Sequence, residues 1–139
     1  MSVIHKLVDA HPITVAQSIA TVGKQIRIPV SAKGLTVEVN FAWGSAGTTA
    51  KLYVQTSFDF GATWIDIMAF AFTTAVSRKI LAISEGAAQL ADIVVTDGTL
   101  TDDTAVDGIL GDRIRARVVT TGTYATATTI SAHAKAKIT

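Results

Sequence analysis

The sequence contains no cysteine among its 139 residues. Disulfide bonds, thiolate catalysis and cysteine-type zinc sites are therefore excluded. A chain of this length suits a single domain, 1–139, which buries roughly two-thirds of the surface that its unfolded form exposes and so needs no covalent cross-link. The lack of cysteine also fits assembly in a reducing cytoplasm.

Charge is scarce as well. Charged residues make up 17% of the chain, hydrophobic residues make up 49%, and the formal net charge is +1. This balance gives no bulk electrostatic reason to expect nucleic-acid binding. A surface poor in charge instead predicts apolar patches that other proteins cover. The alternative is that the many alanines raise the hydrophobic fraction without making the surface adhesive.

Long hydrophobic runs and catalytic signatures are also missing. The amino-terminal stretch MSVIHKLVDAHPIT lacks the pattern of a signal peptide, and no uncharged run is long enough for a membrane span, so we expect neither. His5, His11 and His133 stand in no zinc-binding spacing, and no nucleophile elbow, phosphate loop or dinucleotide fingerprint is present. We therefore expect no enzyme, no metal site and no cofactor.

Threonine, valine and isoleucine dominate the chain, and branching at Cβ favours strands. The clearest strand is Leu35–Trp43, whose apolar residues fall on odd positions, as a half-buried strand requires. The stretch Trp64–Phe72 is apolar on both faces, which predicts a strand that is covered on both sides. The other expected strands are Val3–Val8, Ile13–Ile19, Gln25–Val30, Lys51–Thr56, Ser77–Ser84, Arg113–Thr120 and Thr128–Ile138. About eight short strands without intervening amphipathic helices predict an antiparallel β-sandwich or jelly roll.

Residues 85–112 interrupt this pattern and predict one long excursion from the sheets. Glu85–Ala91 suits one or two helical turns, and Ile93–Val95 suits a short strand. The rest is acidic, with aspartates at positions 97, 102, 103, 107 and 112. Asp97 or the Asp102–Asp103 pair offers oxygens to Ca²⁺, but the spacing does not match an EF-hand, which favours a solvated turn.

The sharpest motif is Ser57-Phe58-Asp59-Phe60-Gly61-Ala62-Thr63-Trp64. It resembles the Asp-box hairpin of sialidase-type propellers, but a propeller needs several blades and this chain has one copy. The pattern predicts a structural turn formed by Ser57, Asp59, Gly61, Thr63 and Trp64. Asp59 is expected to accept bonds from backbone N–H groups of the turn, Gly61 to supply a positive φ, and Trp64 to enter the core.

The end of the chain predicts a hairpin around Gly122-Thr123. Its two strands carry basic side chains at alternate positions: Arg113, Arg115, Arg117, His133, Lys135 and Lys137. Pairing would place these six side by side, with Ile114, Ala116 and Val118 facing inward together with Ala132, Ala134 and Ala136. Like charges on adjacent strands repel, so the set is a candidate docking face for an acidic surface, either another protein or the aspartate-rich loop of a neighbouring copy. The alternative is a solvated face. Nucleic acid is disfavoured because no aromatic residues interleave with the basic ones.

The segment Leu52–Ile67, with the pattern VQxSxDxGxTWxDI, resembles small structural proteins of tailed bacteriophages. Val106–Arg115 and the threonine-rich end are similar to the same proteins, so the resemblance covers about a third of the chain. It implies a virion protein that is assembled in the host cytoplasm and binds the major capsid protein or other virion proteins. Decoration (cement) proteins of this kind are often β-sandwiches that sit as trimers on the capsid.

Three functions follow as hypotheses. The first is a capsid decoration protein that stiffens the shell as a homo-oligomer, with Ser2–Val8, Glu85–Asp112 and the basic hairpin as contact surfaces. The second is a neck, head–tail connector or tail protein. The third is a carbohydrate-binding module, for which the aromatic residues Trp43, Trp64, Tyr53 and Tyr124 are few, and we expect both tryptophans to point inward.

Overall fold

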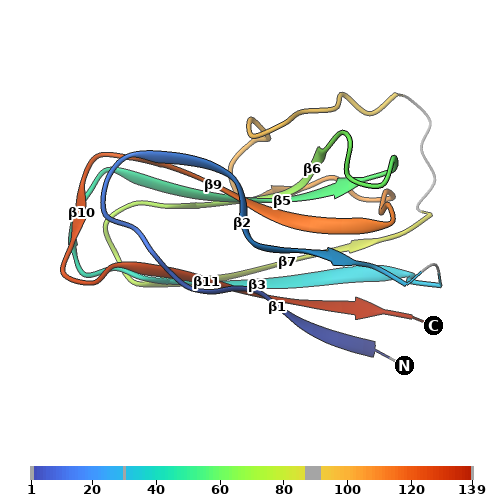
Figure 1. The fold of residues 1–139 in the computed structure, drawn as a ribbon, viewed down its shortest axis with the longest axis horizontal. Coiled ribbons are helices and arrows are strands. Elements are labelled where there is room, and N and C mark those ends of the chain that lie inside the picture. Colours follow the sequence, from blue (N-terminus) through green and yellow to red (C-terminus); the bar gives the residue numbers. More distant parts are fainter. Residues whose placement is uncertain (1, 30, 87–91, 139) are drawn as a thin grey trace.

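Two stacked antiparallel sheets make up the protein (Figure 1). The structure is a computed structural model that describes residues 2–29, 31–86 and 92–138. No helix occurs in these ranges, so none crosses a membrane. The strands are β1 (Ser2–Pro12), β2 (Gln17–Arg27), β3 (Gly34–Ala42), β4 (Ser45–Ala46), β5 (Thr49–Ser57), β6 (Ile65–Phe72), β7 (Ser77–Ser84), β8 (Thr104–Ala105), β9 (Arg113–Thr121), β10 (Tyr124–Ala125) and β11 (Thr129–Lys137).

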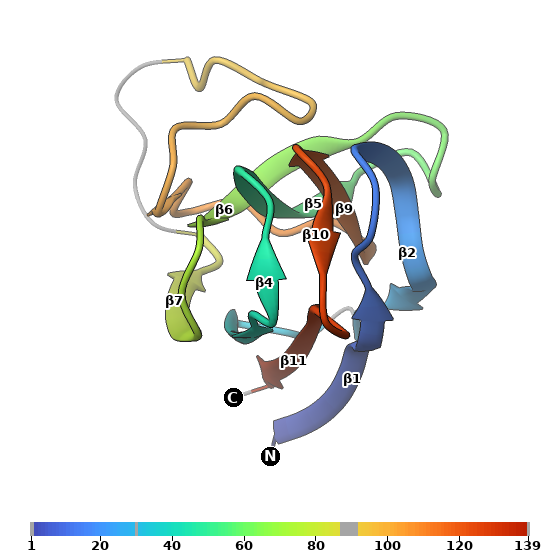
Figure 2. The same ribbon diagram turned by 90° about the vertical axis from the view of Figure 1, so that its left-hand side faces the viewer.

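One sheet has the order β1-β11-β3-β7, and the other has the order β2-β9-β5-β6-β8. The short strands β4 and β10 pair with each other at the end of the sandwich far from both termini (Figures 1 and 2). The long strands pair in a nested way, because the first, β1, lies beside the last, β11, and the second, β2, lies beside β9. The predicted β-sandwich is thus confirmed.

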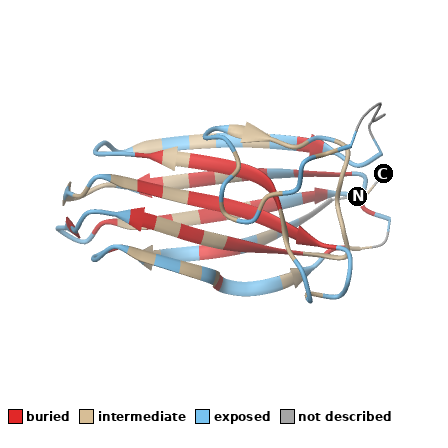
Figure 3. Cartoon of the chain, turned by 90° about the horizontal axis from the view of Figure 1, so that it is seen from above, coloured by how far each residue is buried: buried red, intermediate tan, exposed pale blue. Residues whose placement is uncertain are grey.

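The core lies between the sheets because alternate residues of each strand point into it. In β3 the residues Val37, Val39 and Phe41 are at most 1% exposed. The prediction that Ile114, Ala116 and Val118 face inward together with Ala132, Ala134 and Ala136 is confirmed, since all six are fully buried. Figure 3 shows the buried residues along the central strands and the exposed ones on the edge strands and loops.

Most strands lie within a few residues of their predicted bounds, but the second and third expected strands are wrong. Ile13–Ile19 and Gln25–Val30 are replaced by the continuous strand β2, whose pairing with β9 shifts register at two places. Gly23 stands in the second shift with a φ of +77°, and a Cβ there would come 2.5 Å from the Leu7 carbonyl oxygen. Gly23 therefore lies in a β-bulge, where the missing side chain lets the backbone of β1 approach closely. It does not separate two strands.

The predicted hairpin of the last two long strands is also wrong. β9 pairs with β2 and β5, whereas β11 pairs with β1 and β3, so the two strands lie in different sheets. Between β9 and β11 the chain passes from one sheet to the other. Tyr124, two residues after Gly122 and 2% exposed, anchors this connection in the core. Its ring packs edge-on against Phe41, 5.7 Å between centroids, and its hydroxyl donates to the Thr73 carbonyl oxygen at 2.8 Å.

The expected excursion is present, with a different local structure. Ile93–Val95 is not a strand, because β8 is the element that pairs with the sheet in this region. Glu85 forms a bridge to Gly108, and most of the expected helical turn of 85–91 lies outside the described residues. Residues 92–103 of the excursion run beside the outward face of β6 (Figures 1 and 2).

Truncation of two phenylalanines to alanine should change the free energy of unfolding to very different extents. Phe41 is 1% exposed and stacks on Phe72 at 5.1 Å, so Phe41→Ala should lower the free energy of unfolding by about 3–5 kcal/mol. Phe58 is 58% exposed, so Phe58→Ala should change it by less than about 0.5 kcal/mol. Denaturant titration followed by tryptophan fluorescence measures both, and equal losses would contradict the assigned core.

Candidate functional site

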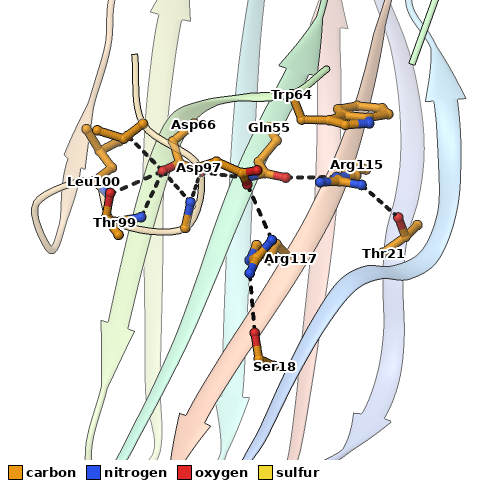
Figure 4. A network of polar contacts seen from close by, with 12 residues as sticks. Ser18, Thr21, Gln55, Trp64, Asp66, Asp97, Thr99, Leu100, Arg115 and Arg117 are labelled. Atoms are coloured by element: carbon orange, nitrogen blue, oxygen red, sulfur yellow. Dashed lines mark hydrogen bonds and ion pairs between the residues drawn. The ribbon is translucent and has the colours of Figure 1, made fainter. Parts of the chain in front are cut away.

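A network of buried polar side chains lies on the outward face of the five-stranded sheet, beneath the excursion (Figure 4). Its centre is formed by Gln55 of β5, Asp66 of β6 and Arg115 of β9, which are 0%, 1% and 8% exposed. They lie close together because the register places Gln55 opposite both Asp66 and Arg115. Burying such groups is costly unless each is hydrogen-bonded, so their partners decide what the network does.

The Asp66 carboxylate is enclosed by the backbone of the excursion. It accepts hydrogen bonds from the N–H groups of Gly98 (2.8 and 2.9 Å), Thr99 (3.1 Å) and Leu100 (3.2 Å), and from the Thr96 hydroxyl (2.8 Å). Successive N–H groups that converge in this way form an anion-binding nest. Gly98 has a φ of +83°, which a glycine adopts without strain.

The pKa of Asp66 reflects two opposing influences. Burial is the larger single influence and raises the pKa, but the hydrogen bonds from Gln55, Gly98, Thr96 and Thr99 together outweigh it, so the pKa lies below its ordinary value. The carboxylate therefore stays charged at neutral pH. Because its oxygens are already occupied by these donors, Asp66 is a clamp for the excursion and has no free position for a substrate proton.

Gln55 and the arginines complete the network. The Gln55 amide donates to Asp66 at 2.8 Å and to Asp97 at 2.6 Å, and its oxygen accepts from Arg115 Nε at 2.8 Å. The Arg115 guanidinium lies 4.4 Å from the ring centroid of Trp64, a cation–π contact. Arg117 pairs with Asp97 at 3.4 Å. Trp64 therefore covers an arginine on the outward face and does not enter the core as predicted, whereas Trp43 does pack against the core.

The six basic residues of the predicted docking face are divided between opposite sides of the sandwich. Arg113, Arg115 and Arg117 share the outward face of β9, as their spacing predicts, and each bonds within its own chain. His133, Lys135 and Lys137 share the outward face of β11, because the alanines between them face the core. The structure does not bring the two sets together, so a single basic surface of all six residues is wrong.

The predicted turn joins β5 to β6, and all five of its named residues contribute to it. The Ser57 hydroxyl donates to Asp59 Oδ1 at 2.8 Å, and the backbone N–H and hydroxyl of Thr63 donate to the Asp59 carboxylate at 2.8 and 2.6 Å. Trp64 Nε1 donates to the Gly61 carbonyl oxygen at 3.1 Å, and Gly61 has a φ of +93°. The turn is thereby rigid and projects its remaining side chains outward.

The sequence did not lead us to predict that two phenylalanines of this turn are exposed at the surface. Phe58 is 58% exposed, and Phe60 is 76% exposed with a φ of +60°. Both line a pocket of about 340 Å³. Its other lining residues are Arg27, Ile28, Pro29, Ala32, Glu85, Leu110, Gly111 and Asp112. The Ser-x-Asp-x-Gly spacing was the available signal, since it places both phenylalanines on the tip of a turn.

The aspartates of the excursion act within the chain. Asp102 pairs with Lys51 at 2.9 Å, Asp103 pairs with Lys79 at 2.9 Å, and Asp112 pairs with Arg113 at 3.1 Å. Asp107 accepts the Ser84 N–H at 2.6 Å. Within the described ranges, no group of three or more histidine, aspartate or glutamate residues is arranged to hold a metal ion.

Comparison with protein-family models, curated proteins and solved structures finds no match to this chain.

Replacing the clamp should loosen the excursion. Asp66→Asn keeps the size of the side chain but turns an NH₂ group toward N–H donors, so the free energy of unfolding should fall by about 1–3 kcal/mol. Hydrogen exchange at the amides of Gly98, Thr99 and Leu100 should accelerate. The control is Asp9→Asn, since Asp9 is exposed and its ion pair with Lys6 faces solvent. Unchanged exchange in Asp66→Asn would contradict the clamp.

The hydrogen bonds of the turn to Asp59 should persist at low pH. The hydroxyl and backbone N–H of Thr63, with the Ser57 hydroxyl, lower the pKa of Asp59 from 3.8 to about 2. Because the folded pKa is depressed, the stabilisation that the carboxylate provides is present above the unfolded pKa and is lost as the pH falls toward 2. Nuclear magnetic resonance titration of the Asp59 carboxyl and the Thr63 amide should give this low midpoint. A midpoint close to 3.8 would show that these bonds do not form in solution.

Proposed function

We propose that the protein is a non-enzymatic structural part of a tailed-phage virion, most simply a capsid decoration protein that binds the outer capsid surface and stabilises the shell. The sequence resemblance supports this role. The nested strand pairing supports a jelly roll, a sandwich of eight strands that occurs in viral capsid and lectin domains. A fold alone does not define a function, which depends on the residues that the surface presents.

The observation that carries the proposal is the conformation of Phe60. A bulky residue at positive φ is a backbone outlier that costs about 1–3 kcal/mol, and such outliers concentrate at functional sites. Here the strained residue is also, at 76%, the second most exposed large hydrophobic residue in the part of the chain that the structure describes. Its exposure gives no stability in return, which is expected if the side chain is buried only when a partner binds.

The surroundings of Phe60 suit protein contact. Phe58 stands beside it, and the adjoining pocket combines apolar residues, such as Ile28, Pro29 and Leu110, with charged ones. Aromatic anchors beside an apolar pocket with a polar rim are the usual centre of a protein interface. The turn lies at the same end of the sandwich as both termini (Figure 1).

A neck, connector or tail location would use the same surface, and the difference lies in which purified particle the chain binds. A carbohydrate-binding module is less well supported. Tyr53 and Tyr124 are at most 3% exposed, and Trp43 and Trp64 are half-buried against the core and Arg115. These four aromatic residues therefore offer no open stacking surface to a sugar.

Replacing Phe60 should weaken capsid binding without lowering the free energy of unfolding. Asparagine tolerates positive φ, so Phe60→Asn should leave the free energy of unfolding unchanged or raise it by up to about 1 kcal/mol. The same variant should bind capsids of the encoding phage at least roughly tenfold more weakly, as loss of an aromatic anchor does. Co-sedimentation with capsids that lack the protein measures binding, and denaturant titration measures stability.

The matched control is Val76→Asn, which removes another apolar side chain, 73% exposed, from the turn between β6 and β7. This variant should bind capsids as the unchanged protein does. Equal binding by Phe60→Asn, or no binding of the unchanged protein to capsids, tails or connectors, would overturn the proposed role. Binding to tails or connectors alone would move the protein to that part of the particle.

A further inference from the structure

The outward face of the four-stranded sheet, here called the basic face, has no element packed on it within the described ranges. The register places Lys6, His133, Glu38 and Ile80 in one row across β1, β11, β3 and β7. Ile4, Lys135, Thr36 and Ala82 form the next row. The two isoleucines are 71% and 57% exposed. The other sheet differs, because the excursion packs on the part of its outward face that is formed by β5 and β6.

The charges of the basic face are unbalanced. Glu38 is paired with Arg78 at 2.6 Å, and Asp9 is paired with Lys6 at 3.6 Å. Lys135 and Lys137 are exposed and make no ion pair with any described residue. The face thus presents two unneutralised cations, and the exposed Ile4 side chain lies directly beside one of them, Lys135, whereas Ile80 lies at the opposite edge of the sheet.

The outer surface of the excursion has the opposite character. Its segment 92–97 carries Val94, 84% exposed, and Val95, 62% exposed. Asp92 and Asp97 flank the two valines, and both are exposed. Asp97 is engaged by Gln55 and Arg117, whereas Asp92 makes no ion pair with any described residue. The charge and apolar character of this strip are complementary to those of Lys135 and Ile4 on the basic face.

The two surfaces lie on opposite sides of the sandwich, so they cannot meet within one molecule (Figure 1). We propose that the basic face of one copy docks on segment 92–97 of a second copy, with the Asp92 carboxylate near Lys135 and the valines against Ile4, the neighbour of Lys135 in the register. Because different patches meet, the contact is heterologous, and it forms a closed ring or an open chain according to the rotation between copies. This contact is separate from capsid binding through Phe60.

Charge reversal with rescue tests the contact. Sedimentation velocity over a range of concentrations should show self-association that weakens as salt rises from about 50 to about 500 mM. Lys135→Glu and Asp92→Lys should each weaken it roughly tenfold or more, because like charges then face each other. The chain that carries both substitutions should recover association. Lys24→Glu is the matched control, because Lys24 is an exposed lysine of β2, which belongs to the five-stranded sheet, and it should associate normally.

Circular dichroism and thermal unfolding of each variant establish that it is folded. A stable monomer at high concentration would overturn the proposal, as would association that neither reversal changes. Failure of the double variant to recover would show that these two residues do not face each other, which also overturns it. If Lys135→Glu abolishes capsid binding while the unchanged protein stays a monomer, the basic face binds another protein and not a second copy. Capsid binding by a monomer would leave the proposed function intact.

Discussion

The burial of the Asp66 carboxylate decides how the surface of this protein is divided. A charge on the middle of a sheet face must be enclosed by donors, and the chain supplies them from Thr96, Gly98, Thr99 and Leu100. These hydrogen bonds hold the segment 92–103 against the five-stranded sheet. The other sheet keeps an uncovered outward face. The two sides of the sandwich consequently differ in charge and apolar character, although the core between them is built from the same alternating pattern.

The division also explains how the aspartate-rich excursion is held in place. Its carboxylates are used to hold a long irregular segment against strands that carry lysines and arginines. Asp97 shows this best, since it joins Gln55 of β5 to Arg117 of β9. Long ordered loops need anchors of this kind because they lack the regular backbone bonding of strands.

Two pairs of exposed apolar residues lie outside the sheets, and each pair is exposed for a different physical reason. Phe58 and Phe60 project from a turn that is fixed by Asp59 and Thr63, so a rigid frame presents them. Val94 and Val95 lie on the excursion, whose inward residues are committed to the network. Both surfaces suit a protein that functions in contact with others, which is the role that we propose for it.

Alternation along single strands was sufficient to predict the sandwich, most strand bounds and the inward set that includes Ile114 and Ala134. The turn at Ser57–Trp64 was equally readable, because its bonds join residues close in sequence. The pairing of strands was not readable, and the last two long strands illustrate the reason. β9 and β11 carry similar inward residues, and that pattern is the same whether the strands share a sheet or face each other across the core.

The buried network shows the same limit. A carboxylate within the apolar run Ile65–Phe72 indicates a buried charge that needs partners, but its backbone donors come from more than thirty residues away in the sequence. The local sequence by itself determined the period of the strands and the turn, since both depend on neighbours along the chain. Only the tertiary structure decided which strands pair, which side chains bind the arginines of β9 and which sheet face stays uncovered. These features depend on contacts between segments that are distant in the sequence.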